Sequence, residues 1–251
     1  MLYNNQKSCL TFQPFNIARI FTFFTAFLLI GQFSLLVLRY SIGTENQVVR
    51  TLIKIFDFDQ EKSLPTLYSG GLLSVCGLLF MILSFTRAPL KVRRASACLS
   101  AVFFFLSADE VLAIHEKLIG PTSRLIKTSG FFTNSWIIPY CIAGFVVLII
   151  TLPFFKKIDS RHRYLMATSA FVYVFGAVGL EMMEGQYLSL DISNIVLRKE
   201  QFPYQFMVTI EETLEMMGCI ILIYTLLSLI RAYGGFSVQI PGQESEYNIR
   251  G

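Results

Sequence analysis

The chain has 251 residues, of which 54% are hydrophobic and only 15% are charged, and its formal net charge is +4. Soluble domains carry about 25% charged residues, so this composition excludes an ordinary water-soluble globule and predicts an integral membrane protein. The basic residues form no run interleaved with aromatic residues, which argues against nucleic acid as a partner. The lipid bilayer is the expected partner.

The apolar runs, taken in chain order, predict six transmembrane helices of about 20 residues each. A polar head, 1–19, precedes the first run, and a polar tail, 231–251, follows the last. The first run ends in Arg39 without a small-residue cleavage site, so we interpret it as an uncleaved span and not as a signal peptide. The predicted fold class is therefore an all-α integral membrane bundle, with spans at about 20–38, 67–86, 95–118, 136–155, 164–187 and 206–230.

Two short loops predict the orientation of this bundle. The loop at 87–94, between the second and third spans, carries four basic residues and no acidic one. The loop at 156–163, between the fourth and fifth spans, carries four basic residues and one acidic residue. Short basic loops stay in the cytoplasm, and an even number of spans places both termini on their side. We therefore expect both termini, with the head and the tail, to be cytoplasmic.

With this orientation, all but three of the 17 acidic residues lie on the non-cytoplasmic side or in the outer half of a span. They form four groups, at 57–61, 109–116, 181–184 and 211–215, which come from separate parts of the chain. Ionised side chains at membrane depth are costly and mark functional sites. The convergence of these groups predicts an acidic pocket that opens to the outer side.

Helical spacing selects the candidate ligands within these groups. In a continuous third span, Asp109 and Glu116 lie about 20° apart, with His115 beside them and Glu110 turned away. The pairs at 181/184 and 212/215 each have i,i+3 spacing, which places their carboxylates on one helix face. The candidate metal ligands are Asp109, His115, Glu116, Glu181, Glu184, Glu212 and Glu215. The secondary candidates are Asp57, Asp59, Glu61, Glu110 and Glu211.

Clustered carboxylates repel one another unless they are protonated or bind a cation. No Lys or Arg lies within the clustered stretches except Lys117, so we expect a divalent metal ion. An oxygen-rich site with one imidazole favours iron, manganese, calcium or magnesium, and zinc is less favoured. The Glu-x-x-His spacing of ferritin-like di-iron bundles is absent, which weakens that particular interpretation.

Three stretches carry a resemblance to a known family: Phe58–Glu61 with Pro65–Ser69, Leu106–Glu116, and Glu211–Gly218. In these stretches the chain resembles a group of uncharacterised bacterial polytopic inner-membrane proteins. The resemblance implies a multi-pass protein of the bacterial inner (plasma) membrane. That group has no established activity, so the resemblance assigns no functional role to any residue.

Three functions are compatible with these observations. The first is a metal-dependent enzyme that acts on a lipid or another hydrophobic small molecule, with one carboxylate free as a general base. The second is a cation- or proton-coupled transporter that uses the same acids. The third is a non-catalytic assembly or sensor protein. The sequence does not decide whether the chain is an enzyme, but the one-sided distribution of the acids favours the first function over transport.

Overall fold

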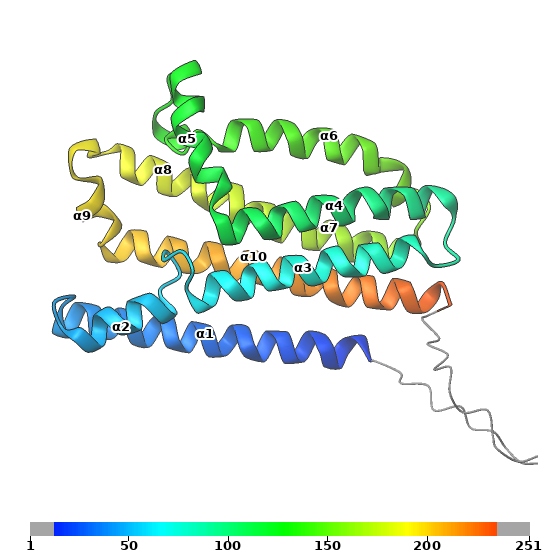
Figure 1. Cartoon of the computed structure of the whole chain (residues 1–251), viewed down its shortest axis with the longest axis horizontal. Coiled ribbons are helices and arrows are strands. Elements are labelled where there is room, and N and C mark those ends of the chain that lie inside the picture. The colour runs from blue at the N-terminus through cyan, green and yellow to red at the C-terminus, as the bar shows by residue number, and fades with distance from the viewer. Residues whose placement is uncertain (1–12, 235–251) are drawn as a thin grey trace, which may run out of the picture.

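The computed structural model describes residues 13–234, and over this range it is helical, without a strand (Figure 1). Six helical segments are long and apolar enough to cross a membrane, as predicted. The remaining residues of the predicted head and tail, 1–12 and 235–251, lie outside the described residues. The six segments are α1 (Pro14–Ile42), α3 (Leu64–Ser84), α4 (Leu90–Leu112), α6 (Ile137–Phe155), α7 to α8 (Ser160–Ser189) and α10 (Phe202–Ala232).

Helices α1, α3 and α10 begin three to six residues before their predicted apolar runs. Proline stands in the first turn of α1, α3 and α10, where its missing N–H breaks no hydrogen bond. The Ser63 hydroxyl also caps α3 by accepting a hydrogen bond from the Thr66 N–H at 3.4 Å. Helix α1 therefore begins at Pro14, inside the segment that the sequence assigned to the polar head.

The third span is not a continuous helix to residue 118, and this expectation was wrong. Helix α4 ends at Leu112, and Ala113 adopts a left-handed conformation with φ 45° and ψ 51°. A separate helix, α5 (Ile114–Leu125), then runs across the long axis of the bundle (Figure 1). Left-handed alanine costs about 1 kcal/mol. The Asp109 carboxylate offsets this cost because it accepts the backbone N–H of His115 at 2.7 Å.

Helix α10 lies between the other helices and contacts α1, α3, α7 and α8. Its apolar core includes Met216, Ile223 and Leu226, each no more than 1% exposed. Small residues let neighbouring helices approach closely, as is usual in membrane bundles. The Ser169 hydroxyl, for example, donates across from α7 to the Gly218 carbonyl oxygen at 2.8 Å. Helix α10 is therefore the element against which the other helices are positioned.

The two ends of the bundle differ in character. One end carries α2 (Gln47–Phe56), α5, α9 (Ile195–Lys199) and the first turns of α10, and we name it the acidic end (Figure 1). The other carries the α3–α4 and α6–α7 loops with the start of α1 and the end of α10, and we name it the basic end. All four acidic groups belong to elements at or near the acidic end, so the fold brings their elements together.

Candidate functional site

Three glutamates from two helices meet near the acidic end. Glu181 and Glu184 belong to α8 (Glu181–Ser189), and Glu211 belongs to α10. One carboxylate oxygen from each lies within 4.8 Å of the others. Glu184 is 2% exposed and Glu211 is 7% exposed. Three carboxylate oxygens at this spacing are able to hold a divalent cation.

An irregular segment of the fifth span positions this cluster. Between α7 (Ser160–Val174) and α8, residues Phe175–Leu180 form a π-helical turn, which is a frequent feature of functional sites. Gly176 lies in this turn, and a Cβ atom there would stand 2.9 Å from the Glu211 carbonyl oxygen. The glycine therefore permits the close approach of the turn to α10, which brings Glu181 and Glu184 to Glu211.

The cluster lacks the partners that would neutralise it. The Glu184 Oε1 atom is buried and has no hydrogen-bond partner, and the same holds for Glu212 Oε2. None of the ion pairs among the described residues involves a glutamate of this cluster. A buried carboxylate without a partner is costly. The arrangement therefore calls for a cation or for protons.

A second group of acids adjoins the first on α10: Glu212 directly follows Glu211, and Glu215 stands one helical turn after it. Glu212 and Glu215 are electrostatic neighbours of Glu110, which reaches them from α4. The Glu110 Cγ atom lies 3.7 Å from the position of a Cβ on Gly70, so its side chain points toward α3 and the interior. Glu110 was expected to face away from the other candidates, but its side chain lies beside those of Glu212 and Glu215.

His115 contacts Trp136, which in turn contacts the glutamate cluster. Its Nδ1 lies 3.3 Å from Asp109 Oδ1, and its ring centroid lies 4.8 Å from that of Trp136. The Trp136 Nε1 in turn donates to Glu181 Oε1 at 3.2 Å. Burial alone would lower the pKa of His115, but the hydrogen bond to Asp109 and its negative charge raise that pKa above its ordinary value. Sequence reasoning missed Trp136 because an interfacial tryptophan is ordinarily a membrane anchor.

Glu116 is not joined to Asp109 in the way that a continuous helix predicts. The left-handed Ala113 separates the two, so they do not share a helix face. Glu116 instead borders a separate open cleft of about 470 Å³ beside α5. The residues that line this cleft are Glu61, Lys62, Val111, Leu112, Ala113, Glu116 and Lys117.

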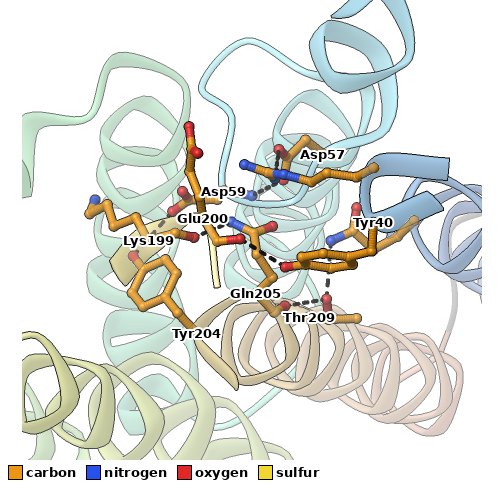
Figure 2. A network of polar contacts seen from close by, with 10 residues as sticks. Tyr40, Asp57, Asp59, Lys199, Glu200, Tyr204, Gln205 and Thr209 are labelled. Atoms are coloured by element: carbon orange, nitrogen blue, oxygen red, sulfur yellow. Dashed lines mark hydrogen bonds and ion pairs between the residues drawn. The ribbon is translucent and has the colours of Figure 1, made fainter. Parts of the chain in front are cut away.

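The acidic residues before α3 connect several segments at the acidic end of the bundle (Figure 2). Asp57 accepts a hydrogen bond from Arg39 at 3.3 Å, and Asp59 accepts one from the Tyr204 hydroxyl at 3.2 Å. Burial raises the pKa of Asp57, although Arg39 and the Asp59 N–H act in the opposite direction. These contacts tie the ends of α1 and α10 to the loop before α3, so both carboxylates already have protein partners.

Helix number, helix length and the buried carboxylates define the chain as a multi-pass helical membrane protein with an acidic interior site. Residues 21–230 match the family described as a domain of unknown function, DUF8692, and the chain belongs to this family. Searches of curated proteins and of solved structures found no match. Family membership agrees with the resemblance to an uncharacterised group and adds no activity.

Proposed function

We propose that this protein is a metal-dependent membrane enzyme that acts on a lipid or another hydrophobic small molecule. One observation carries the proposal: Glu181, Glu184 and Glu211 converge, and a Glu184 oxygen is buried without a partner. A divalent cation held at the cluster would cancel the repulsion among the three carboxylates and would offer Glu184 a partner. The all-oxygen cluster favours magnesium, manganese, calcium or iron over zinc.

The groups around the cluster support chemistry in addition to binding. A divalent cation polarises a carbonyl or phosphoryl oxygen, which makes the adjacent atom easier to attack. His115 is oriented by Asp109 and is linked through Trp136 to Glu181, so it is suited to accept a proton from water. The carboxylate partner orients the imidazole and increases its basicity. We therefore assign His115 as the general base.

The interior beyond the acids argues against the transport alternative. From Met216 to Ile230, the buried residues of α10 are apolar or uncharged, and they pack against Leu79, Phe80 and Leu83 of α3. A transporter needs access to its ions from both sides, whereas the three glutamates lie toward only one end of the bundle. Because the basic loops lie at the opposite end, we further propose that the pocket faces the non-cytoplasmic side of a bacterial inner membrane.

Metal binding is testable with the protein's own fluorophore, since Trp136 is its only tryptophan. Titration of the detergent-purified, chelator-treated protein with Mn²⁺ is expected to change Trp136 fluorescence, because Glu181 accepts the indole N–H. At a metal concentration 100-fold above Kd, unfolding should become about 2.7 kcal/mol less favourable. Glu184→Gln should abolish both effects.

Glu45→Gln is the matched control, because the Glu45 side chain is 90% exposed and far in sequence from the cluster. It should respond to Mn²⁺ as the wild-type protein does. A wild-type protein that contains no metal by elemental analysis, and whose stability Mn²⁺ and chelation leave unchanged, would contradict the proposal.

The catalytic part requires a separate measurement. The Mn²⁺-loaded protein, incubated with a radiolabelled bacterial polar lipid extract, is expected to convert one component, and His115→Gln should prevent this while it still binds Mn²⁺. Release of Mn²⁺ from loaded liposomes by the wild-type protein, without lipid conversion, would establish the transport alternative instead. Metal binding with neither outcome would contradict the enzyme and favour the sensor or assembly function.

A further inference from the structure

We propose that the basic end of the bundle contains a second, serine-based acyl-transfer site, formed by Ser228, His162 and Asp159. The His162 Nε2 atom lies 3.1 Å from the Ser228 hydroxyl oxygen, although 66 residues separate the two in sequence. The other ring nitrogen, Nδ1, bonds to Asp159 Oδ1. This site is independent of the carboxylate cluster, which lies toward the acidic end.

The order of these contacts is that of a nucleophile, a general base and a positioning carboxylate. When Nδ1 carries its proton toward Asp159, Nε2 presents a lone pair to the Ser228 hydroxyl. The hydrogen bond from His162 lowers the pKa of Asp159, so the carboxylate remains charged. The His162 side chain is only 9% exposed, which holds the imidazole in place, while Ser228 is half-buried and accessible.

Ser228 differs from the threonines of α10 in its hydrogen bonding. The hydroxyls of Thr209, Thr213 and Thr225 each donate to the backbone carbonyl four residues earlier. That is the usual arrangement within a helix. Among the described residues, the Ser228 hydroxyl has His162 as its only hydrogen-bond partner. With Nδ1 of His162 protonated, the Ser228 hydroxyl donates to Nε2 and not to the backbone of its own helix.

A positively charged side chain contacts the residue one helical turn before the proposed nucleophile. Tyr224 stands one helical turn before Ser228 and shares its face of α10. The Arg161 Nη2 atom donates to the Tyr224 hydroxyl at 3.0 Å, so the guanidinium lies on the same side as the His162 contact. Donors fixed beside a nucleophile stabilise the oxyanion that forms on a carbonyl oxygen. We assign this role to Arg161.

The substrate class follows from the chemistry and the surroundings. The α6–α7 loop adds Lys156 and Lys157, and the first turn of α7 adds Arg163, so the site suits an acyl ester that carries an anionic headgroup. The Ser228 oxygen attacks the acyl carbonyl carbon while Nε2 of His162 takes the hydroxyl proton. That proton passes to the departing alcohol, which leaves an acyl-serine. Water, deprotonated by His162, then releases the carboxylic acid and restores Ser228.

An active-site-directed fluorophosphonate tests the proposal on the full-length, detergent-purified protein. We expect covalent modification of Ser228, located by peptide mass spectrometry, and no modification there in Ser228→Ala. His162→Gln retains an amide that can bond to Ser228 but removes the base, so labelling should slow by at least about 100-fold. Its Tm should stay close to that of the wild-type protein.

The controls separate this site from other serines and from the metal pocket. Ser160 is exposed at the start of α7, and Ser160→Ala should label as the wild-type protein does. Glu184→Gln and chelation should also leave labelling unchanged, whatever becomes of the metal proposal. If folded wild-type protein is not modified at Ser228, or if His162→Gln reacts at the wild-type rate, then the three residues only fasten α7 to α10 and the proposal is wrong.

Discussion

The two halves of helix α10 bury different kinds of side chain. Its first half carries Gln205, Glu211 and Glu215, all buried at 1–7% exposure. Its second half, from Met216, is packed with Ile220, Leu226 and other apolar side chains. The apolar half has the packing of an ordinary core, whereas the polar half contains buried carboxylates. Packing of the apolar core and the buried carboxylates are therefore found in different halves of a single helix.

The backbone irregularities lie near the polar half of α10 and not near its apolar half. The left-handed Ala113 and the π-helical turn Phe175–Leu180 both lie beside the acids. Such conformations cost free energy and persist only when the surrounding structure holds them. The regular packing of α10 with α3 and α7 supplies that support. Substitutions in the two halves should consequently affect different measured quantities.

The largest effect on stability is expected from the apolar half. Leu226→Ala removes a side chain with 0% exposure and leaves a cavity, which should lower the free energy of unfolding by about 2 kcal/mol. This lies at the low end for such changes because lipid, and not water, is the alternative surrounding. Leu78→Ala, at a position 44% exposed on α3, should change much less. Denaturation in detergent measures the free energy of unfolding of both variants. Equal losses would contradict the idea that the buried apolar half of α10 provides the stability.

A substitution at the π-helical turn should affect both stability and metal binding. Gly176→Ala places a methyl group 2.9 Å from the Glu211 carbonyl oxygen, so α8 must move relative to α10. We expect a loss of about 1–2 kcal/mol in stability. We also expect Mn²⁺ to bind more weakly, as the Trp136 titration would show. The control is Gly144→Ala, because no atom lies within 4 Å of a Cβ at that glycine. Unchanged Mn²⁺ affinity in Gly176→Ala would show that the turn does not position the metal site.

The smallest effect is expected at Asp109, which caps α5 through the His115 N–H. Asp109→Asn keeps an acceptor oxygen but loses the charge. It should lower the free energy of unfolding by about 1 kcal/mol below pH 6. The pKa of His115 is raised in the folded protein, so its contribution is complete below the unfolded pKa of about 6.5 and is lost as the pH rises through the folded pKa. The variant should lose this pH dependence. Unfolding measured between pH 5 and 8 would show it, and an unaltered pH profile would exclude the Asp109–His115 interaction.

The sequence by itself determined the class of protein, its six spans and the separation of acidic from basic ends. These properties depend on hydropathy and charge along one dimension, and the bilayer thickness sets the length of each span. It also predicted that Glu181 and Glu184 act together, since residues three apart in a helix are neighbours.

Only the tertiary structure decided which other residues meet. Glu211 joins that pair because the π-helical turn allows α8 to approach α10, and Glu110 points inward because of how α4 is rotated. The break at Ala113 separated Glu116 from Asp109, whereas packing of α7 on α10 brought His162 to Ser228. Helix rotation, helix breaks and contacts between distant segments arise from packing in three dimensions, which the periodicity of one helix does not contain.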